Sequence, residues 1–263
     1  MKKSVKAIII ILLIICVGVF LFAGYKLISK EIEYKKAQNF YNDLSSAYTN
    51  KNDSEESAPK ATPKPEDEVI LDDEVSPLST DWDTLLKDYP DIVAWLYSPD
   101  TVINYPVAQY DDNAYYLNRQ LNGTYNSSGT LFVECLNSKN FADNNNIIYG
   151  HHMNDGSMFA SLESYSNQEF YEKHPVMYLN TPKYNYRIEL FAAYVTPATS
   201  DTYDITLGDD ASWQSYLDTA ISSSKFTSDV DVKPGDKIIT LSTCTYEYND
   251  ARYVVQGKLV PIH

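Results

Sequence analysis

A continuous apolar run at residues 7–23 (AIIIILLIICVGVFLFA) divides the chain into two parts that cannot share one environment. With its flanking residues it reaches about the ~20 positions that a helix needs to cross a bilayer. Within lipid, a single segment satisfies its backbone polar groups only as a helix. The run is longer than the core of a cleaved signal peptide, and no small-residue cleavage site follows it. We therefore predict an uncleaved, single-pass signal anchor at residues 1–26, with its N-terminus inside the cell.

The charge of the anchor region differs in sign from that of the rest of the chain. Residues 1–30 hold five lysines and no acidic residue, whereas the remainder holds 16 Lys and Arg against 36 Asp and Glu. Because lysines lie on both sides of the apolar run, their bias orients the anchor only weakly. The strongly acidic body argues against nucleic acid as a partner, and solubility is the ordinary reason for such a charge.

The segments after the anchor predict first a helix and then a linker. Residues 27–48 carry a rough apolar stripe at helical spacing, so this helix extends the membrane helix or packs on the body. Residues 49–68 have three prolines and no aromatic or large aliphatic side chain, a composition that cannot bury enough surface to fold. We expect residues 27–68 to be a helical and disordered stalk and residues 69–263 to be the folded body.

Eight short segments of the body, rich in Val, Ile, Tyr and Thr, predict β-strands. Each is bounded by Asp, Asn, Gly or Pro, as the strands of a closed barrel are. Helical patterns at residues 81–89 and 211–224 interrupt the series. We therefore predict a mainly β (α+β) fold, a closed eight-stranded barrel with N-terminal helices and a helix in the connection before KIITLSTC. The strand segments are VAWLYS, TVINYPVA, GTLFVECL, NNIIYGHH, VMYLN, YRIELFAAYV, KIITLSTC and RYVVQGKLV.

The chain has three cysteines, too few for a disulfide scaffold, and it lacks the CxxC spacing of a structural zinc site. Cys16 lies in the apolar run. Cys244 ends the alternating segment KIITLSTC, and a strand end would hold a nucleophilic thiol rigidly. The same place suits a small buried core residue equally well. For Cys135 we expect an inert buried thiol, the alternative being a disulfide with Cys244.

Two adjacent histidines, His151 and His152, follow the segment NNIIYG. A cysteine nucleophile needs a partner that exchanges protons near neutral pH, and imidazole is the natural one. Adjacent residues of a strand point to opposite faces, so the pair is a poor chelator. No HExxH motif or carboxylate-rich set accompanies it. We therefore predict neither a metal site nor a cofactor.

Arg252 opens the segment RYVVQGKLV, eight residues after Cys244. If residues 245–251 form a hairpin turn, the chain returns Arg252 to the side of the cysteine. A guanidinium there could donate hydrogen bonds to a substrate carbonyl or to a developing oxyanion. Taken alone, Arg252 would more readily form a surface salt bridge with Glu247 or Asp250.

Together these segments resemble the class B sortases, cysteine transpeptidases on the surface of Gram-positive bacteria. The resemblance covers essentially the whole body and implies that Cys244 is the nucleophile, His151 the general acid and base, and Arg252 the group that holds the substrate or oxyanion. It also implies a groove for the substrate lined by Asn104, Ala108, Ser242 and Thr243. The motifs that carry it are TLSTC (240–244), NDARYVVQGK (249–258), IIYGHHMNDGSMF (147–159) and the stretch 81–109.

The resemblance implies a two-step acyl transfer outside the cell. The C-terminal sorting motif of a surface protein binds as an extended peptide, and the Cys244 thiolate attacks the carbonyl of its Thr. His151 protonates the leaving amine. An amino group of a peptidoglycan precursor of the lipid II type then resolves the thioester. The implied partners are thus proteins bearing a sorting motif, the precursor amine and the membrane.

Two other functions stay open on the sequence. A pilin-polymerising sortase would differ only in the resolving amine, which would be a Lys of the pilin. A membrane-tethered binding barrel would have lost its chemistry, although the complete set of Cys244, His151 and Arg252 counts against it.

The long connection at residues 196–236 is the expected seat of specificity. It is far longer than an ordinary connection and carries its own helix. Trp213 and Tyr216 on that helix could wall an apolar slot for the sorting motif, as the resemblance favours. The alternative is that their stripe packs against the barrel.

Overall fold

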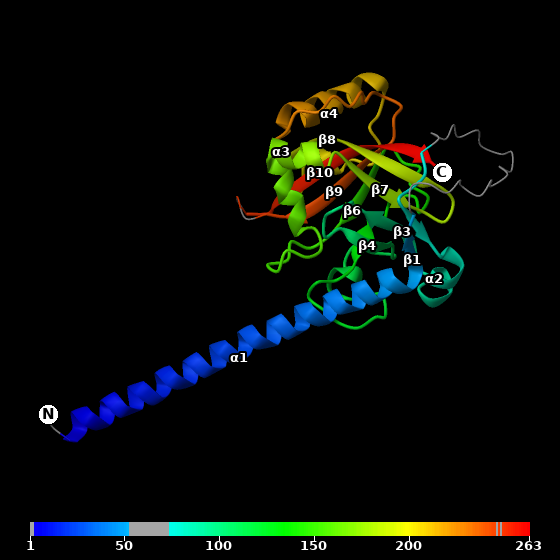
Figure 1. Cartoon of the computed structure of the whole chain (residues 1–263). Coiled ribbons are helices and arrows are strands. Elements are labelled where there is room, and N and C mark those ends of the chain that lie inside the picture. The colour runs from blue at the N-terminus through cyan, green and yellow to red at the C-terminus, as the bar shows by residue number, and fades with distance from the viewer. Residues whose placement is uncertain (1–2, 53–73, 246, 248) are drawn as a thin grey trace.

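Eight strands close into a barrel in the computed structural model, which describes residues 3–52, 74–245, 247 and 249–263 (Figure 1). The strand order around the barrel is β10-β8-β7-β3-β4-β5-β6-β9. Each strand overlaps a segment whose composition predicted it, so the closed, mainly β barrel is confirmed. The strands are β3 (Ile92–Tyr97), β4 (Asn104–Ala108), β5 (Leu131–Val133), β6 (Asn145–Tyr149), β7 (Val176–Asn180), β8 (Asn185–Pro197), β9 (Ile238–Cys244) and β10 (Ala251–Ile262).

Two of the strand pairs are parallel, β4 with β5 and β6 with β9, and the other pairs of the barrel are antiparallel. A parallel pair needs a crossover connection, and the long connection before β9 contributes to that crossover. β9 and β10 are consecutive antiparallel strands, and Cys244 at the end of β9 pairs with Arg252 near the start of β10. The hairpin therefore brings the start of β10 back beside the end of β9.

Alternation along the strands separates two apolar layers. Leu241 on β9 and Val255 on β10 are fully buried in the barrel interior. Val254, one residue away, points outward and is covered by α4 (Asp210–Ser223) through Trp213 and Leu217. The helix expected before the cysteine strand thus exists, and it lies over the outer face of β8, β9 and β10 (Figure 1).

The remaining short helices are set by local caps. The predicted helix at 81–89 is α2 (Trp82–Asp88), whose N-cap Asp81 accepts a hydrogen bond from the Thr84 amide at 3.2 Å. A six-residue helix, α3 (Gln168–Lys173), was not expected from the sequence. The 3₁₀ helices are η1 (Tyr116–Asn118), η2 (Ala160–Ser166) and η3 (Asp201–Tyr203).

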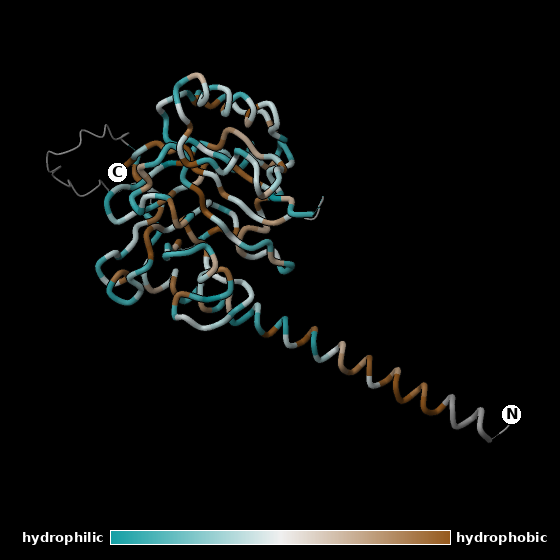
Figure 2. Tube along the Cα trace, turned by 180° about the vertical axis from the view of Figure 1, so that it is seen from behind, coloured by the Kyte–Doolittle hydropathy of each residue, from teal (hydrophilic) through white to brown (hydrophobic). Residues whose placement is uncertain are grey.

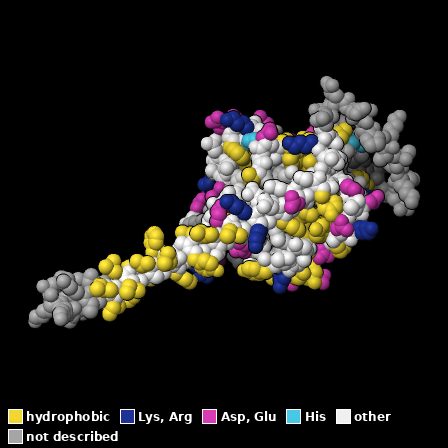
Figure 3. Space-filling model, turned by 60° about the horizontal axis from the view of Figure 1, so that its bottom comes forward, with side chains coloured by type: hydrophobic (Ala, Val, Ile, Leu, Met, Phe, Trp, Pro, Cys, Tyr) yellow, Lys and Arg dark blue, Asp and Glu magenta, His cyan; other side chains and the backbone are white. Residues whose placement is uncertain are grey.

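The N-terminal helix α1 (Lys3–Tyr48) is continuous from the apolar run to the barrel. Its apolar part is long and apolar enough to cross a membrane, and it is fully exposed in the isolated chain. Figure 2 shows that the hydrophobic part of α1 lies away from the barrel, and Figure 3 shows its hydrophobic side chains in the open. The helix expected at 27–48 is therefore an extension of the apolar helix.

The end of α1 also packs on the barrel. Ala37, Tyr41 and Leu44 recur at helical spacing and are almost fully buried. Immediately after the helix, β1 (Thr49–Lys51) pairs with β2 (Leu78–Thr80) in a small antiparallel sheet. Residues 49–51, expected to belong to the linker, are thus a strand, because backbone pairing needs no apolar side chain. The rest of that linker, residues 53–68, and the expected start of the body at residue 69 lie outside the described residues.

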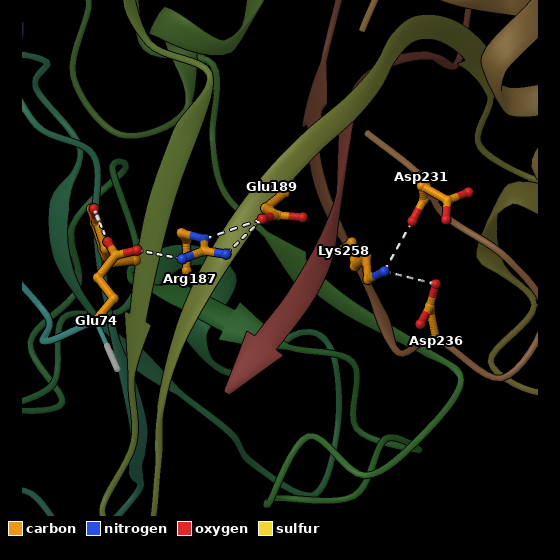
Figure 4. Close-up of polar contacts among 7 residues, drawn as sticks. Glu74, Arg187, Glu189, Asp231, Asp236 and Lys258 are labelled. Carbon is orange, nitrogen blue, oxygen red and sulfur yellow. Dashed lines mark hydrogen bonds and ion pairs between the residues drawn. The ribbon is translucent and has the colours of Figure 1, made fainter. Parts of the chain in front are cut away.

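An ion-pair cluster on β8 fastens the segment that leads into β2 (Figure 4). Arg187 lies between Glu74 and Glu189, with its Nη2 2.8 Å from a carboxylate oxygen of Glu189. The Tyr178 hydroxyl donates to Glu74 at 2.7 Å. These contacts hold Glu74, where the described chain resumes, against the barrel wall.

A second cluster joins the long connection to β10 (Figure 4). The Lys258 ammonium lies 3.1 Å from Asp236 Oδ2 and donates to the Asp231 carbonyl at 2.9 Å. Asp236 stands two residues before β9. The cluster therefore fixes where the chain enters the strand that ends at the candidate nucleophile.

Candidate active site

Two of the predicted side chains lie side by side on neighbouring strands, and a third follows the end of the next strand. Cys244, at the end of β9, is the register partner of Arg252 on β10. On the other side of β9, the parallel strand β6 pairs Tyr149 with Ser242. β6 ends at Tyr149, so His151 lies two residues past this pair, in the segment that follows the strand. Because residues two apart on a strand share a face, Cys244 lies on the same outer face as Ser242, with Arg252 beside it.

The thiol is reachable because the strand leaves the barrel at this point. Ser242 and Thr243 are almost fully buried, whereas Cys244 is exposed. Thr243 pairs with Tyr253 of the interior cluster, so it faces into the barrel. The next residue, Thr245, donates its amide to the Ala251 carbonyl at 3.2 Å, which begins the turn.

The two histidines have different partners. His151 Nε2 lies 2.6 Å from the carbonyl oxygen of Leu117 in η1. Its neighbour His152 has Nε2 3.4 Å from Glu163 and forms a bridge with Met158. The two side chains therefore contact different parts of the chain: His151 contacts η1, and His152 contacts η2 and the loop that follows β6.

Arg252 lies between the cysteine strand and β8. Its Nη1 donates to the Ala251 carbonyl at 3.0 Å, and its register partner on β8 is Thr196. Near Thr196, a cavity of about 550 Å³ lies between α4, η3 and the end of β8. Several hydroxyl side chains line it, together with Asp201 and Asp204.

A pair of tyrosines lies beside Ser242, two residues before the thiol along β9, and was not expected from the sequence. The rings of Tyr149 and Tyr203 stack with centroids 6.2 Å apart, and the Tyr203 hydroxyl is 2.8 Å from the Ser242 hydroxyl. Tyr149 donates to Glu134 at 3.0 Å, and burial together with the Glu134 charge raises the pKa of Tyr149. The only sequence signal for Tyr203 was an aromatic residue in the long connection.

The predicted groove residues do not all gather at the thiol. Ala108 is fully buried beside Phe132 and Tyr116, three strands away from β9. Asn104, at the other end of β4, accepts from the Trp95 indole at 2.7 Å and donates to Ser45 of α1 at 2.8 Å. Asn104 thus holds α1 to the barrel in this structure.

The aromatic residues of α4 pack rather than line an open slot. Trp213 is 5% exposed and sits with Leu217 against the barrel. The Tyr216 hydroxyl accepts from Gln256 at 2.6 Å and donates to the Thr202 carbonyl at 3.0 Å. Burial raises the pKa of Tyr216 to about 12, so this hydroxyl stays protonated. Of the two readings open for these side chains, the contacts favour packing.

Cys135 follows β5, and the structure has both it and Cys244 as free thiols. The Cys135 thiol donates to Glu134 at 3.3 Å, and burial and that carboxylate raise the pKa of Cys135. A raised pKa means less thiolate and lower reactivity. The chemistry of the site therefore centres on Cys244.

The arrangement combines an exposed thiol with a guanidinium beside it on β10 and an imidazole just past the end of β6, the strand on the other side of β9. Such a set can form a covalent acyl intermediate, exchange the proton that acyl transfer requires and donate to the oxyanion. The thiol and guanidinium are fixed by one hairpin, which is a rigid support for their relative placement.

Comparison with known proteins gives one family throughout. The model of the sortase domain matches residues 96–260. Sortase B of Listeria monocytogenes is 38% identical over 253 residues, which is 95% of each chain. Among solved structures, sortase B of Bacillus anthracis in complex with AAEK1 has a TM-score of 0.70 at 30% identity and covers 88% of this chain and 99% of that one. The Staphylococcus aureus sortase B–substrate complex has a TM-score of 0.66 at 34% identity, over 69% and 85%.

Proposed function

Since this chain belongs to the sortase family, and within it to the class B sortases, we propose that it is a membrane-anchored cysteine transpeptidase. Its substrate is a surface protein with a C-terminal sorting motif, which it cleaves after Thr and joins to an amine of a peptidoglycan precursor. The observation that supports the proposal is the pairing of Arg252 with Cys244 on β10 and β9, with His151 just past the end of the neighbouring strand β6.

The first step forms the thioester. The Cys244 thiolate attacks the Thr carbonyl carbon, and the carbonyl oxygen becomes an oxyanion. Arg252, level with the thiol, donates to that oxyanion or orients the carbonyl that becomes it. The C–N bond then breaks, and protonated His151 gives its proton to the departing amine. The products are a thioacyl enzyme and the released C-terminal fragment.

The second step reverses these roles with another amine. The amino group attacks the thioester carbonyl, and neutral His151 takes its proton. The Cys244 thiolate leaves, and a new amide joins the surface protein to the precursor. No step consumes a redox equivalent, and the proton that His151 gives in the first step is recovered in the second. A shielded site favours the amine over water.

The membrane part of the proposal rests on α1. Its apolar stretch is long enough to span a bilayer, and the folded body lies at the C-terminal end of the same helix. With the N-terminus in the cytoplasm, the barrel lies outside the cell, at the membrane surface. Both proposed substrates, one secreted and one lipid-linked, are available on that side.

For specificity we propose the long connection at residues 196–236. It supplies Tyr203 to the surface next to Ser242 and borders the cavity beside Thr196. Exchange of this segment for that of a relative with another sorting motif should change the preferred peptide. A stable chimera that kept its preference would move specificity to β4.

The proposal is tested with the full chain in detergent micelles and a library of fluorogenic pentapeptides. We expect one motif to be cleaved after Thr, and hydroxylamine or an added amine to capture the acyl fragment. Cys244→Ala is the control, because its exposed side chain can be truncated without opening a cavity. Cleavage that persists in Cys244→Ala, or product that never carries the added amine, would refute the transpeptidase.

A further inference from the structure

The ring of His151 is held by a backbone carbonyl rather than by an acidic side chain. Its Nε2 lies 2.6 Å from the Leu117 oxygen, and a carbonyl oxygen can only accept. Nε2 must therefore carry the hydrogen, and in the neutral ring Nδ1 is the nitrogen that accepts a proton. Whatever fixes the Leu117 carbonyl also fixes the nitrogen that exchanges protons.

We propose that Gly129 and Tyr41 are positioning residues for His151, because together they hold the Leu117 carbonyl against its ring. The proposal rests on the acid–base role of His151 in the proposed function. It links the anchor helix to the site through the loop between η1 and β5. The segment formed by η1 and that loop, residues 116–130, is called the histidine clamp below.

Gly129 forms the base of the histidine clamp. It adopts a left-handed conformation with φ +58°, and a Cβ on it would lie 2.5 Å from the Leu117 oxygen and 2.6 Å from the Tyr116 oxygen. The next residue, Thr130, donates its amide to the Tyr116 carbonyl at 3.0 Å. Only glycine lets the backbone at residue 129 approach the backbone at residues 116 and 117 so closely. Position 129 therefore sets where the Leu117 carbonyl lies.

Tyr41 fastens the histidine clamp to α1. Its side chain is 3% exposed, and its hydroxyl donates to the Gly129 carbonyl and lies 3.0 Å from the Thr130 hydroxyl. Burial raises the pKa of Tyr41, so the hydroxyl stays a donor. A second contact lies two turns earlier, where Glu33 accepts from the Ser127 amide at 2.8 Å.

The connection therefore runs from α1 to Gly129, then to the Leu117 carbonyl and then to His151. Each step is a hydrogen bond or a direct backbone contact. The same helix carries the apolar stretch, so the part of the protein that enters the membrane also braces the proton-transfer group. Loss of the brace should change the tautomer of His151 and the acylation rate, while the barrel keeps its fold.

The test uses the full chain in detergent micelles, labelled with ¹³C-histidine. The chain has only four histidines, and the His151 signal is identified by its loss in His151→Ala. The Cδ2 shift distinguishes the two tautomers of a neutral imidazole. The rate of thioacyl formation with the cleaved pentapeptide is measured on the same samples.

Gly129→Ala should abolish the Nε2–H signature of His151 and slow acylation by roughly 10-fold or more, within the ~10²–10⁴ that general acid–base catalysis contributes. Its matched control is Gly123→Ala in the same clamp. Gly123 has φ +78°, and a Cβ there meets only the Tyr115 hydroxyl, at 3.9 Å. The control carries the same backbone strain without touching Leu117, so it should keep the tautomer and the rate.

Tyr41→Phe removes only the hydroxyl and should slow acylation several-fold with a partial change of tautomer. Its control is Tyr48→Phe, a change on the same helix but away from the clamp, which loses a hydrogen bond to Asp88 of α2. Normal tautomer and rate in Gly129→Ala would overturn the proposal. If Gly129→Ala does not fold, normal values in Tyr41→Phe would overturn it instead. A shifted tautomer together with an active His151→Ala would refute the acid–base role and leave the clamp intact.

Discussion

Leu44→Ala, a substitution on the anchor helix, should destabilise the barrel as strongly as one in its core. Leu44 is 4% exposed and belongs to the same apolar cluster as the barrel interior. Truncation of a buried Leu costs about 2–5 kcal/mol, through lost burial and the cavity that remains. A domain of this size loses about 2–4 °C of melting temperature per kcal/mol, so the midpoint should fall by about 5–15 °C.

The assay is thermal unfolding of the full chain in detergent micelles, followed by tryptophan fluorescence. Trp95 is fully buried in the barrel and reports its loss. The matched control is Leu27→Ala on the same helix, where the side chain is 71% exposed. The detergent covers Leu27 in both the folded and unfolded states, so its change should stay within about 0.5 kcal/mol. Equal midpoints for the two variants would mean that the end of α1 is a tether and does not complete the core.

Four further outcomes are expected. Cys244→Ala should abolish peptide cleavage with an unchanged melting temperature, and a residual rate above a few per cent would place the nucleophile elsewhere. His151→Ala should slow acylation ~10²–10⁴-fold while His152→Ala changes it little, and the reverse order would exchange their roles. Arg252→Lys keeps the charge but loses the planar donor fork, so turnover should fall roughly 10²-fold, and near-normal kinetics would show that charge suffices. Burial alone would raise the pKa of Glu134, but the hydrogen bonds to its carboxylate lower that pKa overall. The ionised carboxylate therefore stabilises the fold above the ordinary pKa, and this stabilisation is lost as the pH falls through the pKa of the folded state. Urea titrations should show Glu134→Gln to be less stable than the parent at pH 7 and equal to it at strongly acidic pH.

The strands were predictable because their signal is local. VMYLN became β7 with the same bounds, and the other segments shifted by a few residues at their ends. The continuity of α1 was harder to see, since the side chains change from apolar to charged near residue 26 while the backbone hydrogen bonds continue. β1 was missed for the opposite reason. Its three polar residues have no strand pattern, and pairing with β2 alone makes them a strand.

The parts of the site that sequence could not reveal are backbone groups and distant contacts. The Leu117 carbonyl has no sequence signature, because every residue carries one. In the sequence SSGT, Gly129 indicates only a turn. The need for glycine at this position comes from two backbone carbonyls, twelve and thirteen residues earlier, that leave no room for a Cβ. Trp213 and Tyr216 looked equally suited to a slot and to packing. The contacts that favour packing come from β10 and η3, which no local pattern connects to α4.

The choice between the two histidines depends on the register of one parallel strand pair. β6 and β9 are about 90 residues apart in sequence, and their pairing aligns Ile148 with Leu241, both fully buried inside the barrel. A slip of β6 by one residue would turn Ile148 outward and shift the histidines that follow the strand by one position relative to Cys244. Expulsion of one large aliphatic side chain from the core opposes that slip. The apolar residues that build the barrel therefore also fix where the two histidines leave β6 relative to the end of β9.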